Sequence, residues 1–253
     1  MKIVTIRFKK GYLLAAGLIL LAAVLLISPL GEAVTVAAVK RDLPIYCVEK
    51  ESQTVSMTFD AAWGADDTQT LIDILGKYQV TATFFVVGDW VDKYPEAVKA
   101  LADAGHEVMN HSNSHPHMTE LSRDKMLQEL NSCNDKIEAI TGVRPTLFRA
   151  PYGEYNDALV GTARTAGMYT IQWDVDSLDW KEKGVAHETE RVLTKTKSGS
   201  IILFHNDAKY TPEALPGILE GLIQKGFSFV PVSQLILQEN YQIDHTGRQC
   251  PIQ

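Results

Sequence analysis

Short runs of β-branched and aromatic residues alternate along most of the chain with longer amphipathic stretches. Seven of the short runs have the composition and length of strands and are bounded by turn residues. They are "VSMTF" (55–59), "TATFFVV" (81–87), "HEVMN" (106–110), "TLFRA" (146–150), "MYTIQWDV" (168–175), "SIILFH" (200–205) and "FSFVPV" (227–232). The stretches between them repeat apolar residues at three- and four-residue intervals, which predicts helices. These helices are expected near 67–79, 92–104, 122–141, 155–166, 185–197 and 213–225, with a shorter one after 232.

Glycines stand at the expected ends of several helices. Gly105, Gly142, Gly167, Gly199 and Gly226 fall where the residue after a helix adopts left-handed backbone. Repeated strand–helix units require a parallel sheet, because each helix carries the chain back to begin the next strand. Seven such units within about 180 residues favour a closed barrel over an open sheet. The predicted fold class is therefore α/β, with a barrel of seven βα units.

The N-terminus carries basic residues followed by a long apolar run, Tyr12–Leu30. This run of about 18 residues exceeds the core of a typical signal peptide and just reaches the length of a membrane-spanning helix. Basic residues before an apolar helix predict a cytoplasmic N-terminus, with the rest of the chain outside the membrane. The small-residue stretch "VTVAAV" (34–39) could still be cleaved, so an uncleaved anchor and a removed signal both stay open.

Four segments follow from these patterns. We expect a signal or anchor at 1–35, a connecting segment at 36–50, the barrel at 51–237 and a C-terminal tail at 238–253. The formal net charge of −7, with no cluster of lysine and arginine after the first ten residues, argues against a nucleic-acid-binding surface.

Three cysteines are too few for a disulfide framework. Cys133 shares the spacing of the apolar face of its predicted helix, so we expect a buried thiol. Cys47 and Cys250 flank the barrel and could pair in an oxidising compartment, but sequence does not show whether they lie within bridging distance.

Polar side chains follow the predicted strands at their carboxyl ends. In a parallel barrel these ends converge on one face, so residues far apart in sequence can meet there. The residues in question are Asp60, His111, His115, Arg149, Asp176, Asp179, Trp180 and His205. Together they contain the parts of metal-assisted hydrolysis: imidazoles for an ion, a carboxylate base beside a guanidinium, and a further histidine.

The histidine pair His111 and His115 lies in "HSNSHP" (111–116), just after the third predicted strand. A polar surface loop is one interpretation. Pro116 disfavours helical backbone at His115, so the pair belongs to a turn in which two imidazoles can still face one point. Neutral imidazole is the commonest nitrogen ligand of zinc. Asp89 and Trp90 reach the same rim after the second strand, where they could line a sugar groove or, equally, Trp90 could pack in the core.

The ordered motifs "TFD", "HSNSHP", "RAPYG", "DSLDW" and "LFH" resemble those of the polysaccharide deacetylases of carbohydrate esterase family 4, which share the nodulation-type deacetylase homology domain. The resemblance covers roughly residues 50–237. It implies a deformed (β/α)7 barrel, here preceded by the N-terminal hydrophobic helix. It also implies a divalent ion, usually Zn²⁺, in an enzyme that removes acetyl groups from N-acetylated sugars.

The resemblance assigns roles to the first half of the site. His111 and His115 match the residues that hold the ion. Asp60 matches the general base that takes a proton from the attacking water, and Arg149 matches the residue that keeps this base ionised.

The second half of the site is assigned in the same way. The backbone N–H of Tyr152 matches the oxyanion donor. His205 matches the general acid that protonates the leaving amine, with Asp179 as its carboxylate partner. Trp180 and Leu203 resemble the wall of the pocket for the acetyl methyl group.

One departure from the family pattern concerns the metal. The family has two adjacent aspartates, base then ligand, whereas Asp60 is followed by Ala61 in "TFDAAWGADD". Asp66 or Asp67 could supply the third ligand, or could cap the helix that follows them. His117 could provide a third nitrogen, or Asp60 itself could ligate. A "TFD" with tryptophan and glycine soon after resembles the sporulation-associated branch of these deacetylases.

The expected function is a metal-dependent deacetylase, anchored or exported, that acts on a cell-envelope glycan such as peptidoglycan or a related N-acetylglucosamine polymer. The missing aspartate motivates an alternative, a catalytically silent barrel that binds glycan. A second alternative is an esterase that hydrolyses O-acetyl groups.

Overall fold

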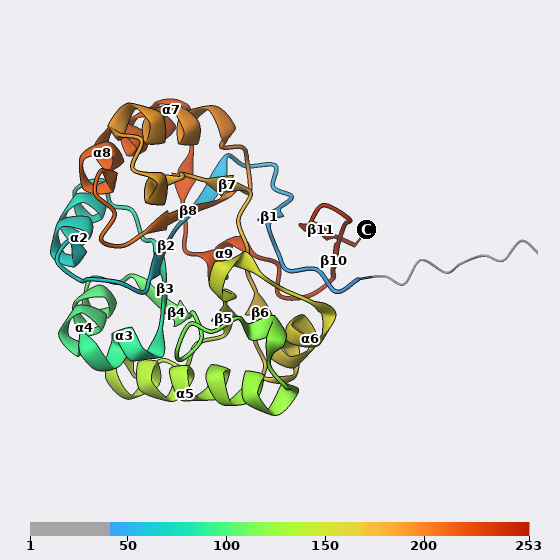
Figure 1. Ribbon diagram of the computed structural model, residues 1–253. Helices are drawn as coiled ribbons and strands as arrows, with labels where there is room; N and C mark the ends of the chain where they lie inside the picture. The colour runs from blue at the N-terminus through green and yellow to red at the C-terminus, as the bar shows by residue number, and fades with distance from the viewer. Residues whose placement is uncertain (1–40, 253) are drawn as a thin grey trace, which may run out of the picture. The chain divides into compact units, whose positions relative to one another are not determined.

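A curved parallel sheet forms the centre of the molecule (Figure 1). The structure, a computed structural model, describes residues 41–252. Seven strands follow the order β6–β5–β4–β3–β2–β8–β7, and β9 pairs with β2. Their bounds are β2 (Thr54–Ala61), β3 (Thr83–Val86), β4 (Glu107–Asn110), β5 (Leu147–Phe148), β6 (Tyr169–Thr170), β7 (Val175–Asp176), β8 (Ile201–His205) and β9 (Ser228–Phe229). The predicted parallel arrangement is confirmed, since all of these strands pair in parallel.

The fifth predicted strand, 168–175, is broken into β6 and β7. β6 pairs with β5 and β7 pairs with β8, so the two halves lie at opposite ends of the strand order. Residues 171–174 therefore cross from one end of the sheet to the other. The sheet closes through the covalent chain and not through a continuous hydrogen-bond ladder, which makes the expected barrel a deformed one.

The segment before the first barrel strand helps to fill the remaining gap. The backbone N–H of Ile45 donates to Thr170 O, and that of Val48 in β1 (Cys47–Val48) donates to Gly199 O, each at 2.9 Å. Figure 1 shows β1 lying between β7 and β6. Gly199 has φ +77°, and a Cβ there would lie 1.6 Å from Val48 O. Only glycine allows this close approach of two backbones.

Helices surround the sheet. They are α2 (Thr68–Lys77), α3 (Gly88–Lys93), α4 (Pro95–Asp103), α5 (Arg123–Thr141), α6 (Asp157–Thr165), α7 (Val185–Lys195), α8 (Thr211–Gln224) and the short α9 (Val232–Leu235). The helix predicted near 92–104 is two helices, because Pro95 lacks the N–H needed to continue the first. Short 3₁₀ turns follow three strands: η2 (Met118–Glu120), η3 (Pro151–Gly153) and η4 (Asp179–Lys181).

Four of the five glycines occupy the predicted left-handed positions after helices, for example Gly142 with φ +73° after α5. The prediction for Gly199 was wrong. The helix α7 ends at Lys195 and is capped by Thr196, so the glycine lies beyond the helix end. Its positive φ serves the contact with Val48 instead.

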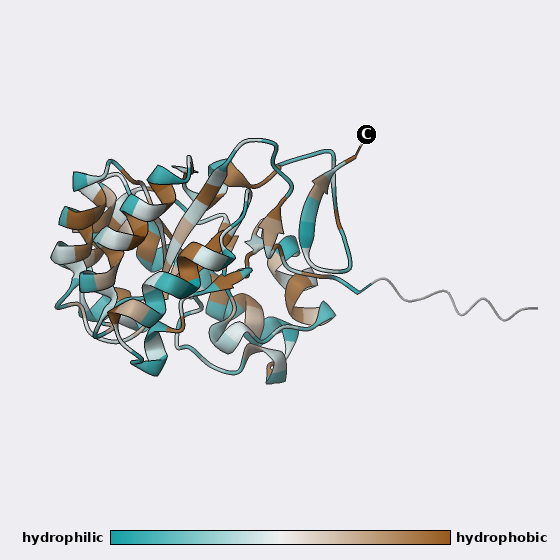
Figure 2. Cartoon of the chain, turned by 90° about the horizontal axis from the view of Figure 1, so that it is seen from above, coloured by the Kyte–Doolittle hydropathy of each residue, from teal (hydrophilic) through white to brown (hydrophobic). Residues whose placement is uncertain are grey.

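The main hydrophobic core lies between the sheet and the helices. Phe59 on β2 stacks against Phe84 on β3 and Phe204 on β8, with ring centroids 4.9 and 5.5 Å apart. Cys133 on α5 is fully buried in this cluster, as the spacing predicted. Figure 2 shows hydrophobic and hydrophilic residues both present around the helices, which is the pattern of helices packed on one side.

The C-terminal residues form two further strands, β10 (Tyr241–Ile243) and β11 (Arg248–Pro251), in a small sheet with β1. Cys47 is in register with Arg248, so Cys250 lies two residues further along the neighbouring strand. That offset adds about 7 Å along the strand, beyond the usual reach of a disulfide. Within the described residues Cys47, Cys133 and Cys250 are free thiols.

The expected leader at 1–35 and the first five residues of the connecting segment, 36–40, lie outside the described residues. Within residues 41–252, no helix combines the length and apolar character that crossing a bilayer requires.

Candidate active site

The predicted site residues gather around one cavity of about 580 Å³ at the carboxyl ends of the strands. Asp60 on β2 and His205 on β8 are register partners, which brings the two side chains to the same level of the sheet. The predicted residues that line the cavity are Asp60, His111, His115, Tyr152, Asp176, Trp180, Leu203 and His205. Arg149 and Asp179 lie behind this lining and contact it.

Asp60 is buried and ion-paired with Arg149. Its Oδ1 lies 2.7 Å from Nη1 of Arg149, a side chain with no exposed surface. The guanidinium also donates to Thr58 Oγ1 and Gln172 O, and it lies over the ring of Phe85 at 4.2 Å. Burial is the largest single influence and raises the pKa of Asp60, but the charge and hydrogen bond of Arg149, together with His111 and His205, outweigh it, and the pKa lies below its usual value. Asp60 is therefore a carboxylate at neutral pH.

His111 is held as a neutral imidazole. Its Nδ1 donates to the backbone carbonyl of Arg149 at 2.8 Å, which leaves the lone pair on Nε2. This Nε2 lies 3.7 Å from Asp60 Oδ2, the oxygen that Arg149 does not bind. Burial lowers the pKa of His111 to about 4. A backbone carbonyl on the far nitrogen is the partner that orients metal-binding histidines.

His115 lies beside His111, with ring centroids 5.0 Å apart. It adopts a left-handed backbone, φ +56°, and its N–H donates to Ser112 Oγ. Burial lowers its pKa as well. His117 does not line the cavity, because its exposed imidazole pairs with Glu154 at 2.9 Å.

The two imidazoles fit a divalent ion of the zinc type, since both are neutral, adjacent and next to a carboxylate. Of the candidates for a third ligand, Asp60 lies beside the pair, with Oδ2 3.7 Å from His111 Nε2, whereas Asp66, Asp67 and His117 do not line the cavity. Ala61, 1 % exposed, packs in the core between sheet and helices. Among residues 41–252, no group of three or more His, Cys, Asp or Glu side chains is arranged to hold an ion.

The two aspartates considered as a third ligand point elsewhere. Asp66 is exposed and does not line the cavity. Asp67 occupies the N-cap position of α2, but its side chain makes no capping hydrogen bond. Its Oδ2 accepts from the backbone N–H of Asp207 at 2.8 Å instead, which ties the loop after β2 to the loop after β8.

His205 is held by a second buried carboxylate, Asp179. The ring Nδ1 lies 2.7 Å from Asp179 Oδ1, and the backbone N–H of His205 donates to Oδ2 at 2.6 Å. Burial lowers the pKa of His205, but the hydrogen bond and charge of Asp179 outweigh it and the pKa is raised. The remaining nitrogen, Nε2, can therefore carry a proton beside the cavity.

Glu188 on α7 is a further buried acid that the motifs do not single out. It is 0 % exposed, and its Oε2 lies 3.1 Å from Thr211 Oγ1, which in turn lies 3.4 Å from Asp179 Oδ2. Burial, followed by the charge of Asp179, raises its pKa to about 7. The spacing of Val185, Glu188 and Val192 puts all three on one face of α7, and this signal could have found it.

Three aromatic side chains at the cavity are largely exposed: Trp63, Tyr152 and Trp180. Tyr152 has a left-handed backbone, φ +60°, in η3. Leu203, by contrast, is buried at the cavity wall. In the sequence, Trp63 belongs only to the resemblance to the sporulation-associated branch and is not marked as a site residue.

Trp90 has the packing role. It is 3 % exposed, and its Nε1 donates to Gly64 O at 2.9 Å. Asp89 is exposed and lies 3.7 Å from Lys136. Neither of the two lines the cavity.

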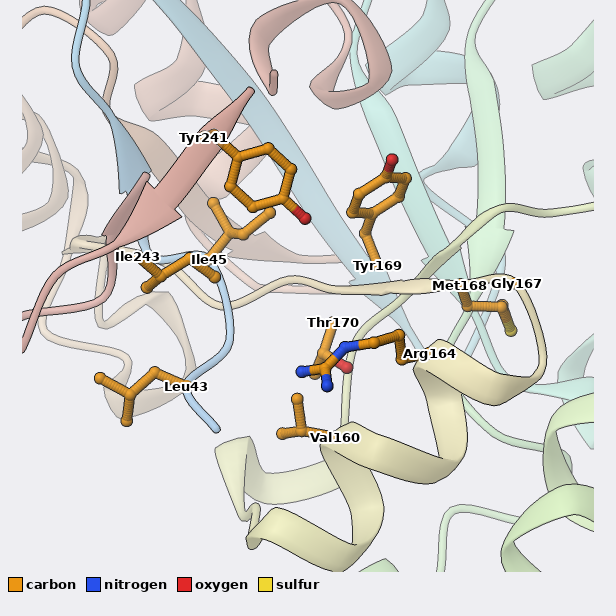
Figure 3. A pocket seen from close by; sticks show the side chains of 10 residues that line it. All are labelled: Leu43, Ile45, Val160, Arg164, Gly167, Met168, Tyr169, Thr170, Tyr241 and Ile243. Carbon is orange, nitrogen blue, oxygen red and sulfur yellow. The ribbon is translucent and has the colours of Figure 1, made fainter. Parts of the chain in front are cut away.

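A second, smaller cavity of about 270 Å³ lies between the segment before β1, α6 and β10. Figure 3 shows Leu43, Ile45 and Val160 on its walls together with the guanidinium of Arg164. Arg164 is paired with Asp42 at 3.0 Å. None of the predicted site residues borders this cavity.

The fold and the site together define a βα barrel with an acid–base cavity at its strand ends. The family model described as polysaccharide deacetylase matches residues 48–171. The chain belongs to this family, carbohydrate esterase family 4, whose members are generally metal-dependent.

Two similar proteins come from Bacillus subtilis. The chain is 34 % identical to the uncharacterized protein YlxY of Bacillus subtilis, over 76 % of this chain and 60 % of that protein. It is 38 % identical to the peptidoglycan-N-acetylmuramic acid deacetylase PdaC of Bacillus subtilis, over 74 % and 40 %. The chain thus spans less than two thirds of either relative.

Among solved structures, a family pseudoenzyme from Bacillus anthracis superposes with a TM-score of 0.74 at 35 % identity, covering 76 % of this chain and 68 % of that one. A mutant of that pseudoenzyme is described as having restored enzymatic activity.

Proposed function

We propose that the chain is a metal-dependent hydrolase that removes N-acetyl groups from a cell-envelope glycan, peptidoglycan or a related N-acetylglucosamine polymer. One observation carries this proposal. An ionised carboxylate, Asp60 with Arg149, and a proton-holding imidazole, His205 with Asp179, meet at one cavity. Glycan binding alone needs neither a base nor an acid.

In this proposal His111 and His115 hold the ion and Asp60 acts as general base. A divalent ion there would supply a Lewis acid that activates water and polarises the acetyl carbonyl. Asp60 Oδ1 is committed to Arg149, whereas Oδ2 faces His111 and is free to take the proton of the attacking water. Arg149 keeps the pKa of Asp60 low, so the base is available well below neutral pH.

His205 gives its proton to the leaving nitrogen. An amine anion is a poor leaving group, so amide cleavage needs an acid in place. Asp179 orients the ring through Nδ1 and raises the pKa, which keeps Nε2 protonated near neutral pH. The backbone N–H of Tyr152 stabilises the developing oxyanion, a contribution of about 3 kcal/mol in comparable sites. Trp180 and Leu203 form the wall against the acetyl methyl group.

His111 and His115 would hold the ion without the usual second aspartate. We infer weaker metal affinity than in a site with two imidazoles and a carboxylate, because an anionic ligand is missing. Asp66 and Asp67 remain candidates for a third ligand only if the loop after β2 rearranges, since Asp67 is bonded to Asp207.

The proposed place of action is outside the cytoplasmic membrane. The N-terminal apolar run supports a single-pass anchor or a cleaved export signal. Peptidoglycan lies on that side of the membrane.

The rival function is a barrel that binds glycan without hydrolysing it. Two observations favour it: Ala61 in place of the usual ligand, and the likeness to a solved pseudoenzyme. Retention of the acid and base favours turnover.

Acetate release decides between these functions. The purified protein is incubated with N-acetylglucosamine oligomers and with peptidoglycan, each with added zinc, cobalt or nickel, beside an Asp60→Asn control. We expect metal-dependent acetate release that Asp60→Asn abolishes. No acetate with any metal or chain length supports the binding barrel, and release from O-acetylated substrate alone supports an esterase.

A further inference from the structure

Trp63 stands at the mouth of the cavity with most of its ring in water. It lies in the loop after β2, two residues beyond Ala61, and its side chain lines the cavity while the residue is 55 % exposed. Its ring centroid lies 5.4 Å from that of His205, with the planes tilted by 48°. A large apolar ring beside the acid and open to solvent has surface available for a ligand.

The backbone around Trp63 is fastened on both sides. The N–H of Ala62 donates to Asn206 Oδ1, and Gly64 O accepts from Trp90 Nε1 and Asn206 Nδ2. Asn206 and Trp90 are both buried. The loop is therefore anchored to the core, although the ring of Trp63 is not packed into it.

Gly64 packs closely against the segment after β8. A Cβ at this position would lie 2.4 Å from Asp207 Oδ2, so a larger residue would require the Asp207 side chain to shift. The backbone at Trp63 is thus fixed by the hydrogen bonds of Ala62 and Gly64 before any ligand binds, which lowers the entropy lost on binding.

Each of the other two exposed rings at the cavity has a neighbouring side chain of this protein over its face. Tyr152 stacks on His117 with ring centroids 4.4 Å apart and an angle of 19°. The ammonium group of Lys181 lies over the ring of Trp180, 4.7 Å from the ring centroid. Among residues 41–252, Trp63 has neither a stacked ring nor a cation over its face, and its contact with His205 is a tilted one.

We propose that Trp63 is a stacking platform for a pyranose ring of the glycan, next to the place where His205 protonates the leaving nitrogen, and that it makes the site prefer oligomers to single sugars. The C–H groups on one face of a pyranose form a flat apolar surface that matches an indole. This inference rests on the proposed function in naming a glycan as the ligand, but it requires binding only and not hydrolysis.

Calorimetric titration with N-acetylglucosamine oligomers of increasing length tests the proposal. The variants are Trp63→Ala, Trp63→Phe and, as a control, Val143→Ala, which removes an exposed apolar side chain away from the cavity. For the wild type we expect affinity to rise with chain length. In Trp63→Ala we expect the Kd of the pentamer to rise about tenfold and most of the gain with length to disappear.

The controls separate stacking from loss of fold. Trp63→Phe keeps an aromatic face and should bind the pentamer within about threefold of the wild type. Val143→Ala should bind like the wild type, and thermal melts should show all variants folded. Pentamer affinity unchanged in Trp63→Ala, an equal loss at every chain length, or no oligomer binding by the wild type would each overturn the proposal. A length-dependent loss in a protein that releases no acetate would uphold the platform and reject the hydrolase.

Discussion

The two sides of the cavity are built from the same residue type with opposite results. Asp60 and Asp179 are both buried aspartates, and each lies 2.7 Å from a basic nitrogen. Asp60 is paired with Arg149, and its pKa is lowered against the effect of burial. Asp179 is paired with His205, and there it is the imidazole whose pKa is raised against the effect of burial.

The difference lies in the partner. A guanidinium does not give up its proton in a protein, so the pair with Arg149 keeps Asp60 a carboxylate at neutral pH. An imidazole titrates near neutrality, so the pair with Asp179 leaves a group that can give its proton away. One side of the cavity is thus suited to accept a proton and the other to donate one at the same pH.

Removing the guanidinium of Arg149 should disrupt the Asp60 side of the cavity and strongly destabilise the fold. Arg149→Leu leaves Asp60 buried without its partner, so we expect a loss of about 3–5 kcal/mol in the free energy of unfolding. Urea denaturation measures this. The matched control is Arg144→Leu, whose arginine pairs on the surface with Asp135 and Glu138 and should cost no more than about 1 kcal/mol. Equal losses in the two variants would contradict the role given to Arg149.

Two histidine variants should distinguish the residue that donates the proton, His205, from a residue that binds the metal, His111. His205→Ala should lower kcat by about 10²–10⁴-fold while metal content is retained, because its imidazole serves as the acid. His111→Ala should lose the metal itself. Elemental analysis and acetate release are measured on the same samples, with His245→Ala in the tail as control. Equal metal loss in both variants would reject this division of roles.

The pH profile should reveal the partner of the acid. Since the pKa of His205 is raised, its proton is present at pH 6.5 and is lost as the pH rises through the folded value. The ion pair of His205 and Asp179 stabilises the fold over the same pH range and loses this contribution as His205 loses its proton. Asp179→Asn removes the raising charge, so the alkaline limb of kcat/KM should move about one pH unit lower. An unmoved alkaline limb would assign it to another group.

Glu188 should give the smallest effect. Its pKa is raised from 4.5 to about 7, first by burial and then by Asp179. A raised folded pKa contributes stability that is complete below pH 4.5 and is lost as the pH passes 7. Glu188→Gln removes this titration. As the pH rises from 4.5 to 7, the free energy of unfolding of the variant should therefore increase relative to that of the wild type by on the order of 2 kcal/mol. Chemical denaturation at several pH values measures it, and a difference that does not change with pH would contradict the shift.

The sequence predicts much of this cavity because strand ends in a parallel sheet converge. Asp60, His111 and His205 could be placed together from their positions after strands alone. The break of 168–175 into β6 and β7 could not be foreseen, since the local pattern is continuous and the break depends on how the distant ends of the sheet meet.

The two tryptophans show the same limit. Trp63 and Trp90 both follow strands, yet one is exposed at the cavity and the other is buried. What distinguishes them is a hydrogen bond from Trp90 to Gly64, between residues that only the folded chain brings together. Gly199 is a similar case, because its positive φ allows the close contact with Val48 and does not end a helix.

Titration of the metal-free protein by NMR tests the division between the two sides most directly, with the Asp60 carboxyl carbon and the His205 ring followed in one series. We expect Asp60 to stay ionised to below its ordinary pKa of 3.8 and His205 to stay protonated above its ordinary 6.5. A His205 ring that is neutral at pH 6, or an Asp60 that takes up its proton above pH 4, would contradict the account.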